Sequence, residues 1–197
     1  MLLMETDTLR SPEGPASRPP FSERRRSRWL RYALRELFST IVPAVVIALL
    51  IHIFLAQSTI VYGQSMEPNL HTDERLVVEK ISYHLHGPQR GDVVILEDPS
   101  GGPIPLVKRV IALPGERVSI ADGRVYIDGI LLDEPYLNQV TAGGSRSWLV
   151  PPLHVFVMGD NRRDSRDSRY FGPAPLEQII GRAVFRYWPL PEFGAVN

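Results

Sequence analysis

The strongest constraint on this chain of 197 residues is an uncharged apolar segment near its N-terminus. Twenty residues from Leu37 to Ala56, LFSTIVPAVVIALLIHIFLA, contain no Asp, Glu, Lys or Arg. As a helix they would extend roughly 30 Å, which matches the hydrocarbon core of a bilayer. A buried helix in a soluble domain would need apolar neighbours on every side, which so small a domain rarely supplies. We therefore predict a transmembrane anchor at residues 37–57.

The charges flanking this segment predict its orientation. Residues 1–36 are rich in Pro, Ser, Glu and Arg without a hydrophobic period, which predicts a disordered tail. Its arginines crowd the N-terminal side of the anchor: Arg24, Arg25, Arg26, Arg28, Arg31 and Arg35. The positive-inside rule then places the N-terminus in the cytoplasm and residues 58–197 outside the cytoplasmic membrane, in a single-pass arrangement. A cleavable signal peptide fits less well, because the tail and the apolar run are both too long for one.

Residues 58–197 have the pattern of an antiparallel β domain. Short runs rich in β-branched residues recur, such as ERLVVEK, DVVILED, LVKRVIAL and HVFVMGD. The pairs Asp122-Gly123 and Asp128-Gly129 flank the run RVYI and predict a tight hairpin. Only ISYHLHG and PLEQI suggest a turn or two of helix. The predicted fold class is mainly β, with one transmembrane helix at the N-terminus followed by an extracytoplasmic β domain.

Composition narrows the possible chemistry. The chain has no cysteine, which excludes disulfides, thiol catalysis and cysteine-based metal sites. Its 22 basic and 22 acidic residues give zero net charge, so no global field attracts nucleic acid. The five histidines are scattered, and neither a metal site nor an organic cofactor is predicted. Of the basic residues, only Lys80 and Lys108 are lysine.

Ser65, in the segment GQSMEPNL, is the candidate nucleophile. It follows an apparent strand and a glycine, and Pro68 comes soon after it. A serine at such a junction can present its hydroxyl and a backbone N–H in the same direction, as acyl transfer requires. A serine in a turn bounded by Gly and Pro is also common without any catalytic role.

Lys108, within PLVKRVIALPG, is the candidate general base. A free lysine has a pKa near 10.4, so only about one in 2,500 is neutral at pH 7. Burial among Leu106, Val107, Val110 and Ile111 would lower that pKa, whereas arginine would stay charged. The alternative is an ordinary strand lysine with a packed stem and a hydrated ammonium.

A third segment, Gly159–Gly172, is dense in polar residues and reads GDNRRDSRDSRYFG. It follows the apolar run HVFVM. Such a segment can be a solvated loop of Asp–Arg pairs, or it can support a reactive site through serine hydroxyls and carboxylate–guanidinium pairs.

The order of these motifs after an anchor resembles bacterial type I signal peptidases. The motifs are SMEP, RGDVV at 90–94, KRVIALPGE at 108–116 and GDNRRDSRDSRYFG. The resemblance runs from the apolar segment to about Gly172 and implies the signal-peptidase fold. It also implies a membrane-bound serine endopeptidase that cleaves signal peptides from exported preproteins after a small-x-small site. In such an enzyme Ser65 is the nucleophile and Lys108 the neutral base.

The resemblance assigns further roles. Ser165 matches the family serine that hydrogen-bonds the lysine, and Asp167 and Arg169 match the pair that keeps the site in shape. Asp160 belongs to the start of the last motif, together with Asn161 and Arg162, and is expected to serve structure. Val61, Met66, Leu70 and Val107 are the expected pocket-lining residues, with ordinary core packing as the alternative. The exported preprotein and the lipid bilayer are the implied partners, and a monomer is expected.

Two positions depart from the family pattern. Gly63 stands where some members have a serine that helps to hold the oxyanion, and Asn69 stands where threonine is usual.

Three other interpretations of the function remain open. These are a catalytically silent anchored β scaffold, a self-cleaving serine–lysine protease of the repressor type, and a Ser-His-Asp hydrolase with His71 or His154 as base.

Overall fold

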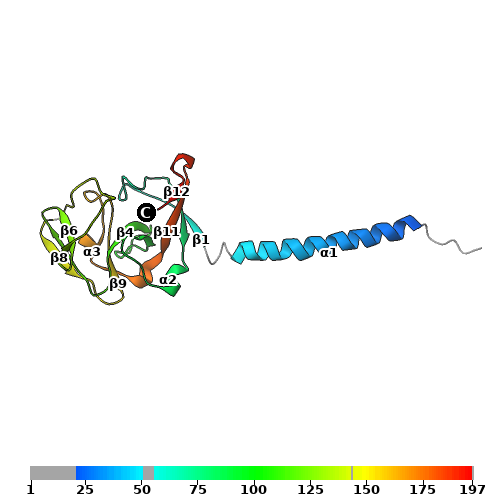
Figure 1. Cartoon of the computed structure of the whole chain (residues 1–197), viewed down its shortest axis with the longest axis horizontal. Helices are drawn as coiled ribbons and strands as arrows, with labels where there is room; N and C mark the ends of the chain where they lie inside the picture. Colours follow the sequence, from blue (N-terminus) through cyan, green and yellow to red (C-terminus); the bar gives the residue numbers. More distant parts are fainter. Residues whose placement is uncertain (1–20, 51–55, 143, 197) are drawn as a thin grey trace, which may run out of the picture. The chain divides into compact units, whose positions relative to one another are not determined.

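A computed structural model describes residues 21–50, 56–142 and 144–196. The chain forms two units, Met1–Ile47 and Ala48–Asn197. The first contains most of a single long helix, α1, which spans Phe21–Leu50 (Figure 1). Among the described residues no helix combines the length and apolar character needed to cross a membrane. Residues 51–55 of the predicted anchor lie outside the described part of the chain.

Helix α1 begins well before the apolar segment, so the prediction of disorder up to residue 36 is wrong for residues 21–36. Residues 1–20 of the predicted tail are outside the described residues. The sequence FSERRRSRWLRYALRE is rich in Arg and also contains Glu, Leu and Ala, which are all good helix formers. Extending an existing helix requires no new nucleation, so this polar stretch can continue the helix of the apolar segment.

The second unit is mainly β, as predicted, and all its strand pairs are antiparallel. The larger sheet has the order β1-β2-β11-β3-β4-β9-β10, with β12 paired to β11. Its strands are β1 Ala56–Ile60, β2 Arg75–Glu79, β3 Val93–Leu96, β4 Leu106–Ala112, β9 His154–Met158, β10 Ala174–Pro175, β11 Ile179–Trp188 and β12 Gly194–Ala195. The helical pieces are short: α2 Ser82–Leu85, α3 Ser168–Phe171, η2 Leu176–Gln178 and η3 Leu190–Glu192.

The smaller sheet has the order β7-β6-β5-β8. Its strands are β5 Arg117–Ala121, β6 Arg124–Ile127, β7 Ile130–Leu131 and β8 Arg146–Leu149. Asp122, Gly123, Asp128 and Gly129 all have positive φ, between 49° and 83°, as two-residue hairpin turns require. The hairpins predicted around RVYI are therefore confirmed as the β5–β6 and β6–β7 connections.

Strand β4 is central to the domain. It pairs with β3 on one side and with β9 on the other, and side chains cover both of its faces. Residues Val107–Ala112 are all buried. Val107 belongs to one apolar cluster and Val110 to a second. Ile111 belongs to a third, which also contains buried side chains of the smaller sheet. A strand covered on both faces has a nearly continuous apolar sequence, and a charged residue within it is placed in a low-dielectric environment.

Candidate active site

Ser65 lies in the loop between β1 and β2. Two backbone hydrogen bonds close the ends of this loop, from Val61 N to Glu74 O (2.8 Å) and from Asp73 N to Val61 O (3.0 Å). Met66, directly after the serine, is only 1% exposed, while Ser65 itself remains partly exposed. Leu70 is also buried and its N–H donates to Met66 O (3.0 Å). Buried side chains thus anchor the loop, while Ser65 itself stays partly exposed.

Lys108 meets Ser65 across a separation of 43 residues. Its Nζ donates to Ser65 Oγ at 2.6 Å and to the carbonyl of Val107 at 3.0 Å. The lysine is 2% exposed, so the alternative of a hydrated surface ammonium is wrong. The structure brings together the two residues that the sequence singled out, because β4 lies beside the Ser65 loop.

Burial lowers the pKa of the Lys108 ammonium from 10.5 to about 8. The nearby guanidinium of Arg169 acts in the same direction, whereas the carboxylates of Asp167, Asp160 and Asp98 favour the charged amine and hold the pKa up. With a pKa of about 8, about one lysine in ten is neutral at pH 7, compared with about one in 3,000 at the ordinary value. The amine can therefore accept a proton at neutral pH.

The charged residues after β9 connect the loop that carries Ser65 with the strand that carries Lys108. Asp160 is fully buried and forms a bidentate pair with Arg109, from Nε to Oδ1 (2.8 Å) and from Nη2 to Oδ2 (2.7 Å). Arg109 directly follows Lys108 in β4, and its guanidinium lies 4.1 Å from the ring centroid of Tyr136. Asp160 therefore holds the strand that carries the lysine.

The next residue, Asn161, holds the serine loop. Its backbone N–H donates to the carbonyl of Ser65 (3.0 Å), and its side-chain Nδ2 donates to Gln64 O (3.1 Å). A Cβ at Gly159 would collide with the Ser65 carbonyl and with the Ser165 side chain, so this approach requires glycine. Residues 159–161 thus pack directly against the backbone of the nucleophile.

The rest of this segment is fixed by buried ion pairs. Asp167 accepts hydrogen bonds from Arg169 Nε (2.8 Å), Arg169 Nη2 (2.7 Å) and Gly159 N (3.0 Å). Arg162 pairs with Glu134 and donates to Thr141 Oγ1 (2.7 Å). Asp167, Arg169 and Arg162 are buried and Glu134 is partly buried, and the pairing of these charges fits a supporting role.

Ser165 does not make its expected contact. It is 8% exposed, and its hydroxyl has no hydrogen-bond partner among the described residues. Both hydrogen bonds of the Lys108 amine go instead to Ser65 and to the Val107 carbonyl. The serine does lie beside the backbone of Ser65, since both would contact a Cβ at Gly159. Its role in the site stays a prediction.

Sequence reasoning missed several groups that organise the site. Arg109 stands next to Lys108 in a motif already noted, so its position was a usable signal. Glu134 and Tyr136 lie in the connection between β7 and β8, and no pattern in that stretch pointed to them. Of the two histidines considered as alternative bases, His71 lies 3.4 Å from Glu74, and His154 Nδ1 lies 2.8 Å from the carbonyl of Pro152.

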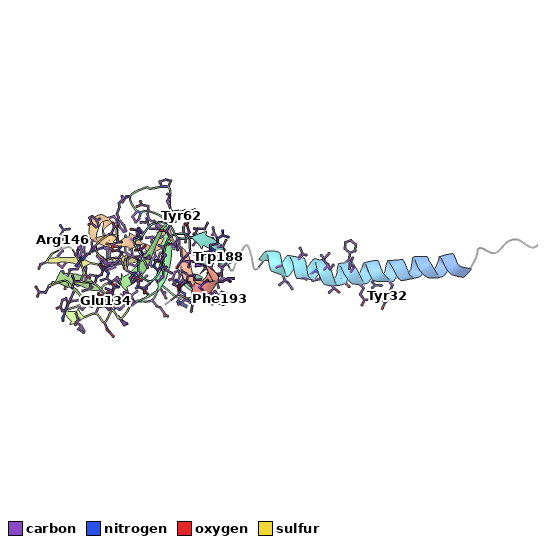
Figure 2. All side chains as sticks on the ribbon, turned by 90° about the horizontal axis from the view of Figure 1, so that it is seen from above. Tyr32, Tyr62, Glu134, Arg146, Trp188 and Phe193 are labelled. Atoms are coloured by element: carbon purple, nitrogen blue, oxygen red, sulfur yellow. The ribbon has the colours of Figure 1, made fainter. Side chains whose placement is uncertain are left out.

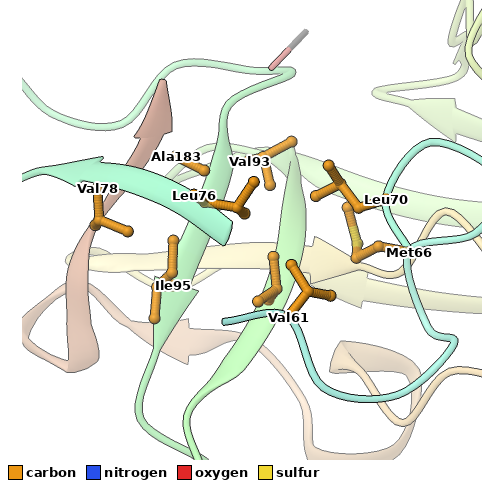
Figure 3. Packing of buried hydrophobic residues seen from close by; sticks show 9 residues of the cluster. Val61, Met66, Leu70, Leu76, Val78, Val93, Ile95 and Ala183 are labelled. Carbon is orange, nitrogen blue, oxygen red and sulfur yellow. The ribbon is translucent and has the colours of Figure 1, made fainter. Parts of the chain in front are cut away.

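The four expected pocket-lining residues share one apolar cluster. Val61, Met66, Leu70 and Val107 pack there with Leu76, Val78, Val93, Ile95 and Ala183, and Figure 3 shows this packing. All four are buried, which agrees with the alternative of core packing. Their contact with a substrate stays a prediction.

Comparisons with known proteins show the family to which this chain belongs. The family model described as signal peptidase, peptidase S26, matches residues 34–188. The probable signal peptidase I-2 of Synechocystis sp. is 40% identical over 167 residues, which cover 82% of this chain and 77% of the relative. Signal peptidase I of Leptolyngbya laminosa is 38% identical over 195 residues, which cover 95% of this chain and 94% of the relative. A crystal structure of a signal peptidase I from Enterococcus faecalis V583 is 34% identical, with a TM-score of 0.44, and covers 48% of this chain and 95% of that chain. The chain belongs to the signal peptidase family, peptidase S26.

Proposed function

We propose that this chain is a serine endopeptidase that removes N-terminal signal peptides from exported preproteins, with Ser65 as nucleophile and Lys108 as general base. One observation carries the proposal. The Nζ of a lysine that is 2% exposed lies 2.6 Å from the hydroxyl of a partly exposed serine. A buried amine with a lowered pKa is the form of lysine that can activate a hydroxyl.

The reaction follows the general course of acyl transfer. The neutral amine of Lys108 takes the proton of Ser65 while Oγ attacks the scissile carbonyl carbon. In this proposal the backbone N–H of Ser65 donates a hydrogen bond to the developing oxyanion. The lysine ammonium then gives its proton to the leaving amine, and an acyl-enzyme remains on Ser65. Water, deprotonated by Lys108, releases the signal peptide from the serine.

The edge of β4 beside Lys108 suits an extended substrate. Residues Leu106–Lys108 pair with β3 on one side, whereas the pairing of β4 with β9 begins only at Arg109. An extended peptide could therefore add to this edge and place its carbonyl at the nucleophile. Side chains that alternate along such a peptide would enter the apolar cluster of Val61, Met66, Leu70 and Val107, which favours small residues at the cleavage site.

A membrane location agrees with the family and with the surface of the domain. Ile60, Arg75 and Trp188 are in register across β1, β2 and β11, so one end of this sheet carries Trp188. Tyr62, Trp188 and Phe193 are large side chains that remain exposed (Figure 2). Aromatic residues of this kind suit the interface of a bilayer.

We infer from this surface and from the apolar segment that residues 37–57 anchor the protein in the cytoplasmic membrane. The N-terminus then lies in the cytoplasm and residues 58–197 form a monomeric extracytoplasmic catalytic domain. An anchor that holds enzyme and preprotein in the same membrane replaces a three-dimensional search and helps to orient the reacting groups.

The test is cleavage of a preprotein by the full chain in detergent, comparing wild type with Ser65→Ala and Lys108→Arg. Wild type is expected to cut after the small-x-small site, and both variants to be inactive while still folded. Lys80→Arg is the matched control, because it makes the same change at the only other lysine and should retain activity. Normal cleavage by Lys108→Arg would refute the role of the neutral amine. A wild-type protein that cuts no preprotein would favour the silent scaffold.

A further inference from the structure

The side chain of Asn69 joins three segments that are distant in the sequence. Its Nδ2 donates to Asp160 Oδ2 (2.8 Å), in the segment after β9, and to the carbonyl of Tyr136 (3.0 Å), between β7 and β8. Asn69 itself lies in the loop of the nucleophile, four residues after Ser65. We propose that Asn69 is a positioning residue that holds the Ser65 loop against the strand of Lys108. This inference rests on the peptidase function proposed above.

The contacts of Asn69 belong to a closed path through the catalytic pair. Ser65 Oγ meets Lys108 Nζ, and Lys108 is bonded through the chain to Arg109. Arg109 donates two hydrogen bonds to the carboxylate of Asp160. The next residue in the chain, Asn161, donates its backbone N–H to the carbonyl of Ser65, which closes the path. Asn69 adds a second connection between the serine loop and Asp160. The loop is therefore attached to residues 160–161 at two points, through the backbone N–H of Asn161 and through the carboxylate of Asp160 that fixes the lysine strand.

The chemistry of an amide explains why this residue can make both connections. A side-chain amide has two N–H donors on one nitrogen, and here one meets a carboxylate and the other a carbonyl. A threonine hydroxyl, the usual choice of the family at this position, has one donor and could serve only one of them. Aspartate has no donor at neutral pH and would face Asp160 with a like charge.

The backbone of Asn69 is fixed as well, so its side chain acts from a defined position. The N–H of Asn69 donates to the carbonyl of Met66 (3.0 Å). Its own carbonyl accepts a hydrogen bond from Arg186 Nη1 (3.1 Å), which in turn pairs with Glu74 at the end of the same loop. Loss of the side-chain amide would release the loop from Asp160 while these backbone contacts remain.

The experiment compares kcat and KM for preprotein cleavage by full-length wild type, Asn69→Leu and Asn69→Thr in detergent. Misplacement of a reacting group by about 1 Å costs on the order of 100-fold in rate, so Asn69→Leu should lose about that much kcat with KM little changed. Asn69→Thr retains one hydrogen-bond donor, so its kcat should lie between those of wild type and Asn69→Leu, about tenfold below wild type. Asn138→Leu is the control, because Asn138 is an exposed residue of the β7–β8 connection and should keep wild-type kcat.

The pH dependence of kcat/KM separates positioning from general loosening. Loosening would let water reach Lys108 and move the midpoint of the acid limb upward, toward the ordinary lysine pKa. Positioning leaves Lys108 buried, so the midpoint should stay where wild type has it.

Wild-type kcat in Asn69→Leu, or a loss of kcat that accompanies a shifted midpoint, would overturn the inference. Should Asn69→Leu fail to fold, wild-type kcat in Asn69→Thr would overturn it equally. A wild type that cleaves no preprotein would instead refute the proposed function itself.

Discussion

Replacing Lys108 with methionine should abolish activity and stabilise the protein at neutral pH. Methionine has similar length and flexibility but carries no charge into the buried site. The folded protein holds the Lys108 ammonium at a pKa of about 8 instead of 10.5, and this difference of about 2.5 units corresponds to about 3 kcal/mol. The lost hydrogen bonds to Ser65 and to the Val107 carbonyl offset about 1 kcal/mol. A net gain of about 2 kcal/mol in the free energy of unfolding is expected below pH 8.

The gain should depend on pH in a defined window. The folded-state pKa of Lys108 is lower than its unfolded value, so between about pH 8 and pH 10.5 the unfolded chain binds more protons. Wild-type stability therefore rises with pH across this window, while Lys108→Met lacks that rise. Above pH 10.5 the advantage of Lys108→Met should have disappeared, because both states of the wild type then carry a neutral amine.

The assay is urea unfolding of the full chain in a nonionic detergent, followed by tryptophan fluorescence at several pH values between 6 and about 10.5. Lys80→Met is the matched control. A difference between wild type and Lys108→Met that stays constant over this range would refute the argument that burial destabilises the ammonium. So would a Lys108→Met protein that is less stable than wild type at pH 6.

Two further changes test the charges around the catalytic pair. Asp98→Asn removes a carboxylate that raises the pKa of Lys108, so the acid limb of the kcat/KM profile should move to lower pH. An unchanged or higher midpoint would contradict this assignment. Asp160→Asn leaves the buried guanidinium of Arg109 without its carboxylate and should cost about 4 kcal/mol in urea unfolding. Exposed Asp133→Asn is its control, and a loss below about 1 kcal/mol would show that the pair does not hold the strand.

Local sequence patterns were sufficient for most of the β domain. The strands β2, β3, β4 and β9 coincide with runs of β-branched residues, and two Asp-Gly pairs specified the turns around β6. The strands β7, β8, β10 and β12 were not predicted. Strands β7, β10 and β12 have only two residues each, too few to carry a periodicity, and β8, RSWL, contains no β-branched residue. The polar start of α1 was missed for a related reason, since its helix is continuous with the apolar segment.

The sequence by itself determined which groups could do the chemistry. Of lysine and arginine, only lysine can become neutral near pH 7, and Ser65 and Lys108 lie in motifs whose order after an apolar segment is specific. The tertiary structure decided whether they act together. The fold brings Lys108 Nζ to 2.6 Å from Ser65 Oγ, although the two residues are 43 positions apart in the sequence. It also buries the lysine, which is 2% exposed. It also places the Tyr136 carbonyl and the Asp160 carboxylate within hydrogen-bonding distance of the Asn69 side chain. These properties depend on desolvation and on contacts between segments remote in the chain, which no local pattern encodes.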